Sequence, residues 1–306
     1  MPSSMTYNSY CLNLGDGQKW QFVFNTDVMA WGRKLVSMLE LKNRKANGHP
    51  RLFFTRKTLN ETEEGCPLHQ LIAYSKEELP KSGWRTHDLV SLRFWYHQDV
   101  SDVICEIGTE EGQVVDVIRM WLSLFPVYQK VRDSGGLPLH AALISFKEVC
   151  VLLSAPGGTG KSTCCRRLPA GWHEHCDDET LIVYDRNQRY LAHPFPSWSD
   201  YVYRRSERTW NVQQHLPISA IFFLEQAEAD EAIRIGQGQA AIRINSAARQ
   251  VSRRYWRNLS HEEERKEKNE LFENACKLAR AVPSYILRVS LTGRFWEQIA
   301  RVTQHA

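Results

Sequence analysis

The sequence lacks the segments that hold a chain in a membrane or send it out of the cell. No hydrophobic run approaches the roughly 18 residues needed to cross a bilayer. Residues 1–10 have neither the basic start nor the apolar centre of a signal peptide. We therefore expect a cytoplasmic protein without a membrane partner.

Paired cysteines are also missing. None of the eight cysteines forms a C-x-x-C pair, and no histidine lies at a spacing typical of a zinc site. Small, buried, reduced thiols are the interpretation that we favour. The alternative is a redox or nucleophilic role for Cys164 and Cys165, which follow a glycine-rich segment, or for Cys176, which precedes two aspartates.

Positive charge is not concentrated anywhere in the chain. The net charge is only +4, and neither a Lys/Arg run nor a DNA- or RNA-binding motif occurs, so we expect no nucleic-acid partner. The remaining composition is that of a globular protein. With 306 residues, 42% of them hydrophobic, the chain can bury the core of one large domain or two.

One glycine-rich segment predicts the functional class. Residues 154–163 read S-A-P-G-G-T-G-K-S-T and directly follow the apolar run 149–153, which is typical of a buried strand. The three glycines allow successive backbone N–H groups to turn toward polyphosphate oxygens. Lys161 supplies a positive charge, Ser162 a hydroxyl for Mg²⁺, and a helix expected from about Gly160 adds its positive N-terminal dipole.

The segment therefore predicts a nucleotide site that uses ATP and Mg²⁺. The residues expected to line it are Ala155, Pro156, Gly157, Gly158, Thr159, Gly160, Lys161, Ser162 and Thr163. Ala155 stands where the strict pattern has glycine. A glycine-rich turn that carries a lysine by chance is the alternative.

Three acids follow in the segment Cys176-Asp177-Asp178-Glu179, just before the predicted strand 180–184. Phosphoryl transfer needs a metal-bound phosphate chain and a carboxylate that orients or deprotonates the attacking hydroxyl. Neighbouring strand positions point to opposite faces, so we expect Asp177 to place the metal or its waters and Asp178 to face the acceptor. Ordinary turn residues are the alternative.

His140 is the third candidate. It lies on the predicted strand 139–144, whose hairpin partner is the strand before the glycine-rich loop. This hairpin brings the imidazole near the phosphates, where it orients the acceptor or stabilises developing charge. A hydrogen-bonded structural histidine is the alternative.

The chain divides into two predicted domains at the Gly- and Pro-containing segment 134–138. Residues 1–133 are expected to form a mixed α/β module, for which peptide or partner recognition is a hypothesis. Its expected strands are 7–14, 20–25, 51–55, 89–96 and 103–107, with helices at 27–41 and 111–132.

Residues 134–306 are expected to form the nucleotide-binding catalytic domain. Besides the strands named above, we expect strands at 190–193, 218–225, 231–235 and 285–291. Ser260 and Glu263 form a capping-box pattern that opens a helix. The side chains that this helix is expected to bury are Leu271, Phe272, Cys276 and Leu278.

The pattern L-H-A…V-L-L-S-A-P-G-G-T-G-K-S-T…C-D-D-E-T resembles the catalytic domain of the HPr kinase/phosphorylase family, whose nucleotide fold is similar to that of phosphoenolpyruvate carboxykinase. The resemblance covers about residue 137 to the C-terminus. It implies that His140, Lys161 and Asp178 occupy active-site positions, with Asp178 as the base for the acceptor hydroxyl and Ser162 as a metal ligand. The implied fold class is mixed α/β and α+β-like, a P-loop domain of this kind with a smaller N-terminal module.

Other segments resemble a narrower group, the HPr kinase-like proteins of the SynChlorMet gene cassette, which is associated with radical-SAM-modified peptides. These segments are residues 121–128 (W-L-S-L-F-P-V-Y), 193–198 (H-P-F-P-S-W), 209–212 (T-W-N-V) and 291–296 (L-T-G-R-F-W). Related kinases phosphorylate a serine of a precursor peptide. The resemblance therefore implies a peptide or small-protein acceptor.

The sequence departs from true HPr kinases after Pro196, where the segment that recognises HPr and carries a metal-binding glutamate has no counterpart. HPr is therefore a poor candidate substrate. Asp200 and Glu207 lie in this region outside any matching motif. Three nearby arginines are candidates for a phosphate clamp, with solvated surface residues as the alternative: Arg204, Arg205 and Arg208.

The sequence thus predicts an ATP-dependent kinase that acts on a Ser or Thr hydroxyl of a peptide or small protein. A nucleotide-gated binding protein that transfers no phosphate is the second hypothesis. A scaffold whose degenerate loop binds no nucleotide is the third. All three leave oligomerisation open.

Overall fold

The computed structural model describes residues 8–43, 50–56, 67, 71–72, 79–203 and 207–303. The chain forms two compact units. The first unit contains residues up to Asn13, residues 18–127 and residues 198–209, and the second contains residues 14–17, 128–197 and the chain from Trp210 onward. Each unit has a sheet of its own and is described by itself.

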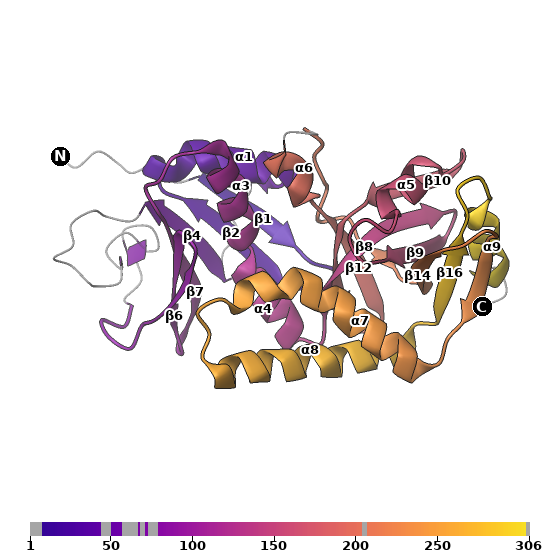
Figure 1. Cartoon of the computed structure of the whole chain (residues 1–306). Coiled ribbons are helices and arrows are strands. Elements are labelled where there is room, and N and C mark those ends of the chain that lie inside the picture. Colours follow the sequence, from indigo (N-terminus) through magenta and orange to yellow (C-terminus); the bar gives the residue numbers. More distant parts are fainter. Residues whose placement is uncertain are drawn as a thin grey trace. The chain divides into compact units, whose positions relative to one another are not determined.

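The first unit is built on a seven-stranded mixed sheet with the order β3-β1-β2-β4-β7-β6-β5 (Figure 1). Its strands are β1 (Asn8–Asn13), β2 (Lys19–Phe24), β3 (Lys42–Asn43), β4 (Arg51–Arg56), β5 (Arg85–Leu89), β6 (Leu92–His97) and β7 (Val100–Ile107). Strands β2, β4 and β7 are parallel neighbours, and the other pairings are antiparallel. The predicted hairpin around residues 15–17 is confirmed as β1 and β2.

Helices pack on this sheet through apolar and aromatic side chains. The helical segments are η1 (Thr26–Val28), α1 (Met29–Met38), α3 (Gln113–Leu122), α6 (Trp198–Val202) and the beginning of α4 (Phe125–Asp133). Trp31 of α1 lies against Phe54 and Phe24, whose rings stack at 4.8 Å. Val23 and Phe53, at neighbouring positions of the same strands, join a second buried cluster, as expected for side chains that alternate between faces.

Two elements that were each predicted as continuous in the first 133 residues are divided in the structure, so these predictions are wrong. The strand expected at 89–96 is a hairpin of β5 and β6, which turns at Val90 with φ of 54°. The helix expected at 111–132 is divided into α3 and α4. Pro126 explains this break, because it has no N–H to donate and its ring would clash with the carbonyl of Leu122, where α3 ends.

The second unit contains a nine-stranded mixed sheet with the order β13-β12-β11-β8-β9-β14-β16-β15, and β10 also pairs with β8. The strands are β8 (Leu137–Phe146), β9 (Val149–Ser154), β10 (Trp172–Cys176), β11 (Glu179–Tyr184), β12 (Tyr190–Phe195), β13 (Leu216–Pro217), β14 (Ala220–Gln226), β15 (Glu231–Arg234) and β16 (Ser284–Val289). Strands β9, β14 and β16 are parallel neighbours. The strands predicted for this part of the chain are confirmed.

Helices cover the sheet of the second unit. They are α5 (Lys161–Arg166), α7 (Gln237–Ser252), η2 (Arg253–Trp256), α8 (His261–Ala281) and α9 (Phe295–Thr303). Side chains of β8, β9, β14 and β16 form one buried cluster with residues of α5 and α9. Helix α7 contacts β8, and α8 lies alongside α7 (Figure 1).

The capping box that opens α8 is confirmed, since the Ser260 hydroxyl accepts from the Glu263 N–H and the Glu263 carboxylate accepts from the Ser260 N–H. Leu271 and Leu278 are buried as predicted. Phe272, however, is 45% exposed, and Cys276 is only partly buried. Leu271 and Leu278 share one stripe of the helix, whereas Phe272 is rotated from it by about 100°.

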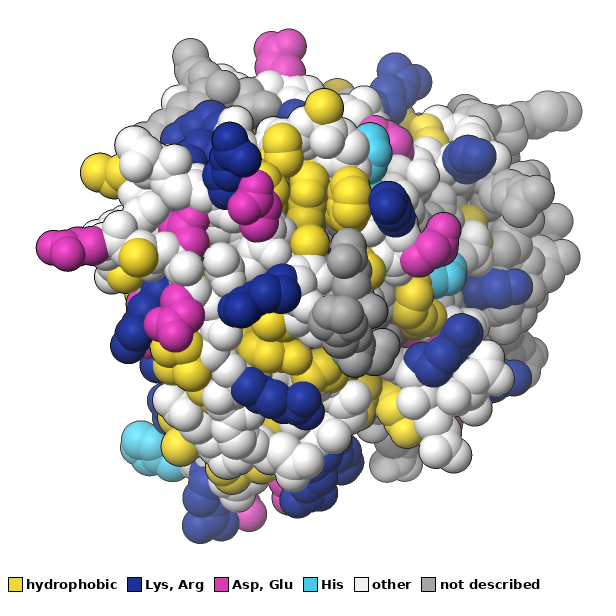
Figure 2. Space-filling view, turned by 90° about the vertical axis from the view of Figure 1, so that its right-hand side faces the viewer, with side chains coloured by type: hydrophobic (Ala, Val, Ile, Leu, Met, Phe, Trp, Pro, Cys, Tyr) yellow, Lys and Arg dark blue, Asp and Glu magenta, His cyan; other side chains and the backbone are white. Residues whose placement is uncertain are grey.

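None of the helices in the described part of the chain is long and apolar enough to cross a membrane. Figure 2 views the face that lies on the right of Figure 1. Lys and Arg side chains are spread over this face, with acidic side chains and small hydrophobic areas between them.

Candidate functional site

The candidate site lies where strand β8 changes its pairing partners. Residues 137–140 of β8 pair with β11, and residues 141–146 pair with β9. Strand β10 pairs with residues 143–146 of β8, on the edge that also pairs with β11. The bend between β10 and β11 therefore lies along this edge, and β9 lies along the opposite one. This register places His140 next to the end of β9 on one side and next to that bend on the other.

The glycine-rich segment has the predicted strand–loop–helix arrangement. Strand β9 ends at Ser154, and α5 begins at Lys161. Gly158 and Gly160 have φ values of 80° and 112°, a backbone conformation that residues other than glycine rarely adopt. A Cβ atom added at either glycine would meet no atom within 4 Å, so these positions face open space.

The loop also presents free hydrogen-bond donors. The Thr159 N–H donates to the Pro156 carbonyl at 3.3 Å. The N–H groups of Gly157, Gly158 and Gly160 have no acceptor among the residues that the structure describes. Such a run of free amides suits an anion with several oxygens. Since α5 is only six residues long, these amides and Lys161 matter more than the helix dipole.

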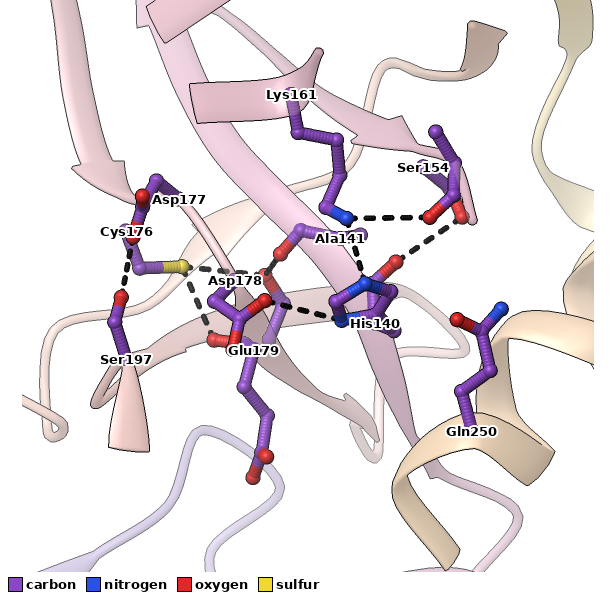
Figure 3. A network of polar contacts seen from close by, with 12 residues as sticks. His140, Ala141, Ser154, Lys161, Cys176, Asp177, Asp178, Glu179, Ser197 and Gln250 are labelled. Atoms are coloured by element: carbon purple, nitrogen blue, oxygen red, sulfur yellow. Dashed lines mark hydrogen bonds and ion pairs between the residues drawn. The ribbon is translucent and has the colours of Figure 1, made fainter. Parts of the chain in front are cut away.

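Lys161 and Asp178 each contact one nitrogen of the His140 ring (Figure 3). The Lys161 Nζ atom lies 2.6 Å from Nε2 of His140, and Nδ1 of the same ring lies 3.2 Å from the Asp178 carboxylate. An ammonium group can only donate, so it assigns Nε2 as the acceptor and leaves the proton on Nδ1. The structure thus brings together the three predicted catalytic residues, which come from β8, α5 and the β10–β11 bend.

Burial and two neighbouring carboxylates act in opposite directions on the pKa of Lys161. Its side chain is buried, and Nζ also donates to the Ala155 carbonyl at 3.1 Å. Burial lowers the pKa of Lys161 below its ordinary value, although the charges of Asp178 and Asp177 oppose this change. A further anion beside Nζ would favour the charged ammonium in the same way.

Asp178 is held as a carboxylate. Burial raises the pKa of its carboxyl group, but the hydrogen bond from His140 and the charges of Lys161 and Arg254 more than offset this, so the pKa lies below its ordinary value. The group is therefore ionised at neutral pH. It can accept a hydrogen bond from a hydroxyl group without first losing a proton.

Asp177 points elsewhere. Its carboxylate accepts a hydrogen bond from the buried hydroxyl of Ser197 (Figure 3). The Ser162 hydroxyl is half-buried and has no hydrogen-bond partner among the described residues. No group of three or more His, Cys, Asp or Glu side chains suited to a metal ion occurs in that part of the chain. The metal ligands predicted at Ser162 and Asp177 stay a prediction.

Two hydrogen bonds hold the bend that carries Asp178, one within the bend and one to β8. The Cys176 thiol donates to the Glu179 carbonyl at 3.1 Å, and the Thr180 hydroxyl donates to the Ala141 carbonyl at 2.9 Å. The second contact joins β11 to the residue that follows His140 in β8. These bonds hold the carboxylate of Asp178 opposite the imidazole.

Glu179 is a correction to the prediction of three acids at the rim of the site. Its side chain is 2% exposed, and its carboxylate accepts a hydrogen bond from the Tyr128 hydroxyl. Burial raises the pKa of Tyr128 well above its ordinary value, and the charge of Glu179 raises it further. The phenol is therefore a neutral donor, and Glu179 belongs to the buried layer behind the site.

The same layer contains two residues that sequence reasoning missed, Arg254 and Tyr255 of η2. Burial lowers the pKa of the Arg254 guanidinium, while the negative charges of Glu179 and Asp178 act in the opposite direction. Arg254 also donates to the Val251 carbonyl at 2.9 Å. These residues lie far along the chain from the loop, and no local motif marks them.

The cysteines near the loop are buried thiols, as favoured from the sequence. Cys164, Cys165 and Cys176 are each at most 5% exposed. Burial raises the pKa of all three, in Cys176 to about 12. Because the thiolate is the reactive form, these values argue against the redox or nucleophilic alternative.

The candidate residues named from the segment after Pro196 are not part of the second unit. Asp200, Glu207 and Arg208 belong to the first unit. Arg204 and Arg205 lie outside the described residues. The phosphate clamp that these arginines would form stays a hypothesis.

The model of the SynChlorMet cassette protein ScmC family matches residues 103–304, which is more than half of the chain. The chain belongs to the SynChlorMet cassette protein ScmC family. No curated protein matches it in sequence.

The ScmC match includes the whole strand–loop–helix segment, His140 and the bend with Asp178. It also includes the four segments on which the SynChlorMet resemblance was based. Membership of the SynChlorMet group is therefore confirmed, and the resemblance to HPr kinases stays a prediction. The matched region begins within β7. Most of the first unit lies before it.

A small cavity of about 90 Å³ adjoins the loop of this ScmC family member. It is lined by Ser154, Ala155, Pro156, Phe223, Leu224, Arg243, Ser246, Ala247 and Gln250. Arg243 pairs with Glu225 at 2.8 Å, and its guanidinium lies over the ring of Phe223. Residues of α7 therefore line the same hollow as the first residues of the loop.

Proposed function

We propose that the chain is an ATP-dependent kinase that transfers a phosphoryl group to a Ser or Thr hydroxyl of a peptide or small protein. Its second unit would have a nucleotide fold of the HPr kinase and phosphoenolpyruvate carboxykinase type. The observation that carries the proposal is the contact of His140 with both the Lys161 ammonium and the Asp178 carboxylate.

The loop and Lys161 would bind the phosphates. The loop N–H groups that have no acceptor in the described residues would donate to phosphate oxygens, and Nζ would exchange its contact with the Ala155 carbonyl for a phosphate oxygen. A fixed cluster of amides and one ammonium stabilises charge on a transferred phosphoryl group without reorganisation. This arrangement would hold the β- and γ-phosphates.

The residues present fit a magnesium ion of the kind that accompanies ATP. Mg²⁺ in phosphoryl-transfer sites keeps several waters and takes few protein ligands besides the phosphates. The Ser162 hydroxyl has no partner in the described residues and would contact the ion. The half-buried Asp177 carboxylate, which accepts from Ser197, would help to place the ion or its waters. The bound ion would neutralise part of the negative charge of the phosphates.

Asp178 would orient the acceptor hydroxyl. Its lowered pKa makes it a weak base before reaction. A loose phosphoryl-transfer transition state needs little proton removal before the bond to phosphorus forms, so a weak base suffices. As the bond between the hydroxyl oxygen and the γ-phosphorus forms, the bond from the γ-phosphorus to the β–γ bridging oxygen would break and ADP would leave. The hydroxyl proton would pass to the Asp178 carboxylate. His140 would hold that carboxylate in position through its Nδ1–H.

The decisive experiment is to incubate the full chain with ATP, Mg²⁺ and a library of Ser- and Thr-containing peptides, and to look for a mass gain of one phosphoryl group. Asp178→Asn should retain MgATP binding in calorimetry and lose transfer. Lys161→Ala should lose roughly 10- to 100-fold in nucleotide affinity, as expected for a charged hydrogen bond. Asp133→Asn, an exposed carboxylate on α4, is the control that should change neither.

Three outcomes would count against the proposal. Transfer by Asp178→Asn at the rate of the unchanged protein would remove the assigned base. Absence of MgATP binding would remove the nucleotide site altogether. MgATP binding without transfer to any peptide would favour the second hypothesis, a nucleotide-gated binding protein, for which the alanine at position 155 is the specific observation.

A further inference from the structure

The first unit has a cavity of its own, at the carboxyl ends of its parallel strands. Its volume is about 520 Å³, within the range of small-molecule sites. Strand β4 ends at Arg56 and β7 at Ile107, and both residues line the cavity together with Val28, which follows β2. Ligand sites of α/β sheets lie at this edge.

The apolar part of the cavity is formed before any ligand binds. Val28, Trp31 and Ile107 line it and are each at most 9% exposed. The Trp31 indole N–H donates to the Asp116 carbonyl at 3.3 Å, and the ring packs 5.4 Å from that of Phe54. This indole is therefore fixed in place and can receive an apolar group.

Two of the three acids that line the cavity face one buried arginine. The Arg119 side chain is 1% exposed, pairs with Glu110 and lies 3.5 Å from the Asp116 carboxylate. It also donates to the Glu110 carbonyl at 2.7 Å. Its single positive charge thus offsets one of the two negative charges of Glu110 and Asp116.

Two cations of the cavity have no ion pair of this kind. Lys34 and Arg56 line it, and neither forms an ion pair with another residue in the described ranges. One Arg56 nitrogen donates to the Gly108 carbonyl at 3.1 Å, and the Arg56 backbone N–H donates to Asp27 at 3.2 Å. The remaining guanidinium N–H groups are available for a carboxylate.

We propose that this cavity binds an amphipathic carboxylate. The carboxylate pairs with Lys34 and Arg56, and the apolar group packs against Trp31 and Ile107. Glu111, an exposed acid of the same lining, has no ion pair in the described part and disfavours a second negative charge on the ligand. Such a ligand is either an acidic side chain in a peptide or a free organic acid. The inference does not depend on phosphoryl transfer.

The test uses the full chain without nucleotide and measures binding by calorimetry and saturation-transfer NMR. The peptide probe is acetyl-Leu-Asp-Leu-amide, and its neutral match is acetyl-Leu-Asn-Leu-amide. The free-acid probe is N-acetyl-leucine, and its match is N-acetyl-leucinamide. We expect at least one acid to bind roughly tenfold or more tightly than its neutral match, as for a charged hydrogen bond. The acid that binds more tightly identifies the source of the ligand.

Variants of the lining residues test whether the ligand binds in this cavity. Arg56→Gln and Lys34→Gln should each weaken the acid roughly tenfold, to the level of the neutral probe. Glu111→Gln should strengthen it several-fold, because it removes a repulsive charge. Lys19→Gln alters an exposed lysine of β2 outside the cavity and should have no effect. Failure of both acids to bind, or binding to Arg56→Gln as tight as to the unchanged chain, would overturn the proposal.

Discussion

The Nζ atom of Lys161 lies 2.6 Å from Nε2 of His140. The imidazole thus lies between the Lys161 ammonium and the Asp178 carboxylate and contacts both. His140→Gln should lower phosphoryl transfer about 100-fold, because both neighbours lose their orientation, while MgATP affinity changes little. Single-turnover transfer and calorimetry measure the two effects. His173→Gln alters an exposed histidine of β10 and should leave both unchanged.

His193 makes stability depend on pH. Burial lowers its pKa to about 4, and its ring accepts from the Gly15 N–H at 3.0 Å and contacts the Val212 carbonyl at 2.8 Å. Below about pH 6.5 the unfolded chain takes up a proton that the folded chain does not, so stability should fall between pH 6.5 and about 4, by about 3 kcal/mol in total. Denaturant unfolding at several pH values measures this loss.

The matched variants are His193→Gln and the exposed His173→Gln. The first should be less stable at pH 7.5 and show a smaller loss of stability on acidification. The second should follow the unchanged protein. Equal pH dependence of the unchanged protein and of His193→Gln would show that another group titrates.

Gly136 cannot be replaced without moving the backbone. A Cβ atom there would lie 2.3 Å from the Ile182 carbonyl oxygen and 2.6 Å from a Val131 methyl carbon. Gly136→Ala should therefore lower the free energy of unfolding by about 2 kcal/mol or more. Gly238→Ala, in α7, meets no atom within 4 Å and should raise it by about 0.5 kcal/mol. Loss of stability in both variants would mean that something other than the local clash acts at residue 136.

The thiols beside the candidate site should be unreactive in the folded protein. Burial raises the pKa of Cys150 and Cys176 to about 12. At pH 8 only about 1 in 10,000 of these groups is a thiolate, so iodoacetamide should label them only after unfolding. Cys276, which is partly buried, should label first among the described cysteines. Peptide mapping by mass spectrometry reads this order, and rapid labelling of Cys176 would revive the redox alternative.

The sequence predicted the centre of the candidate site because its parts are local or lie on neighbouring strands. The loop is one continuous segment, and the hairpin of β8 and β9 brings His140 to its start. The strand before Asp178 could not be predicted in the same way. Its position depends on β10 and β11 following each other along one edge of β8, which is a property of the sheet and not of any short segment.

Other features of the fold could not be predicted, because hydrophobic periodicity shows neither backbone breaks nor contacts between distant residues. The apolar pattern of 111–132 continues through Pro126, where the backbone cannot. The turn at Val90 requires a left-handed conformation that valine rarely adopts, so its sequence gives no sign of it. The contact between Tyr128 and Glu179 joins residues 51 positions apart, and only the packed unit brings them together.

The exchange of segments between the two units has a consequence for how the chain folds during synthesis. The first unit includes residues 198–209, so it stays incomplete until the ribosome has passed them, long after residue 127 has emerged. The second unit needs residues 14–17, whose Gly15 amide bonds to His193, so the opening hairpin must remain accessible until that histidine is made. The two units should therefore reach their native state late and together, rather than one after the other.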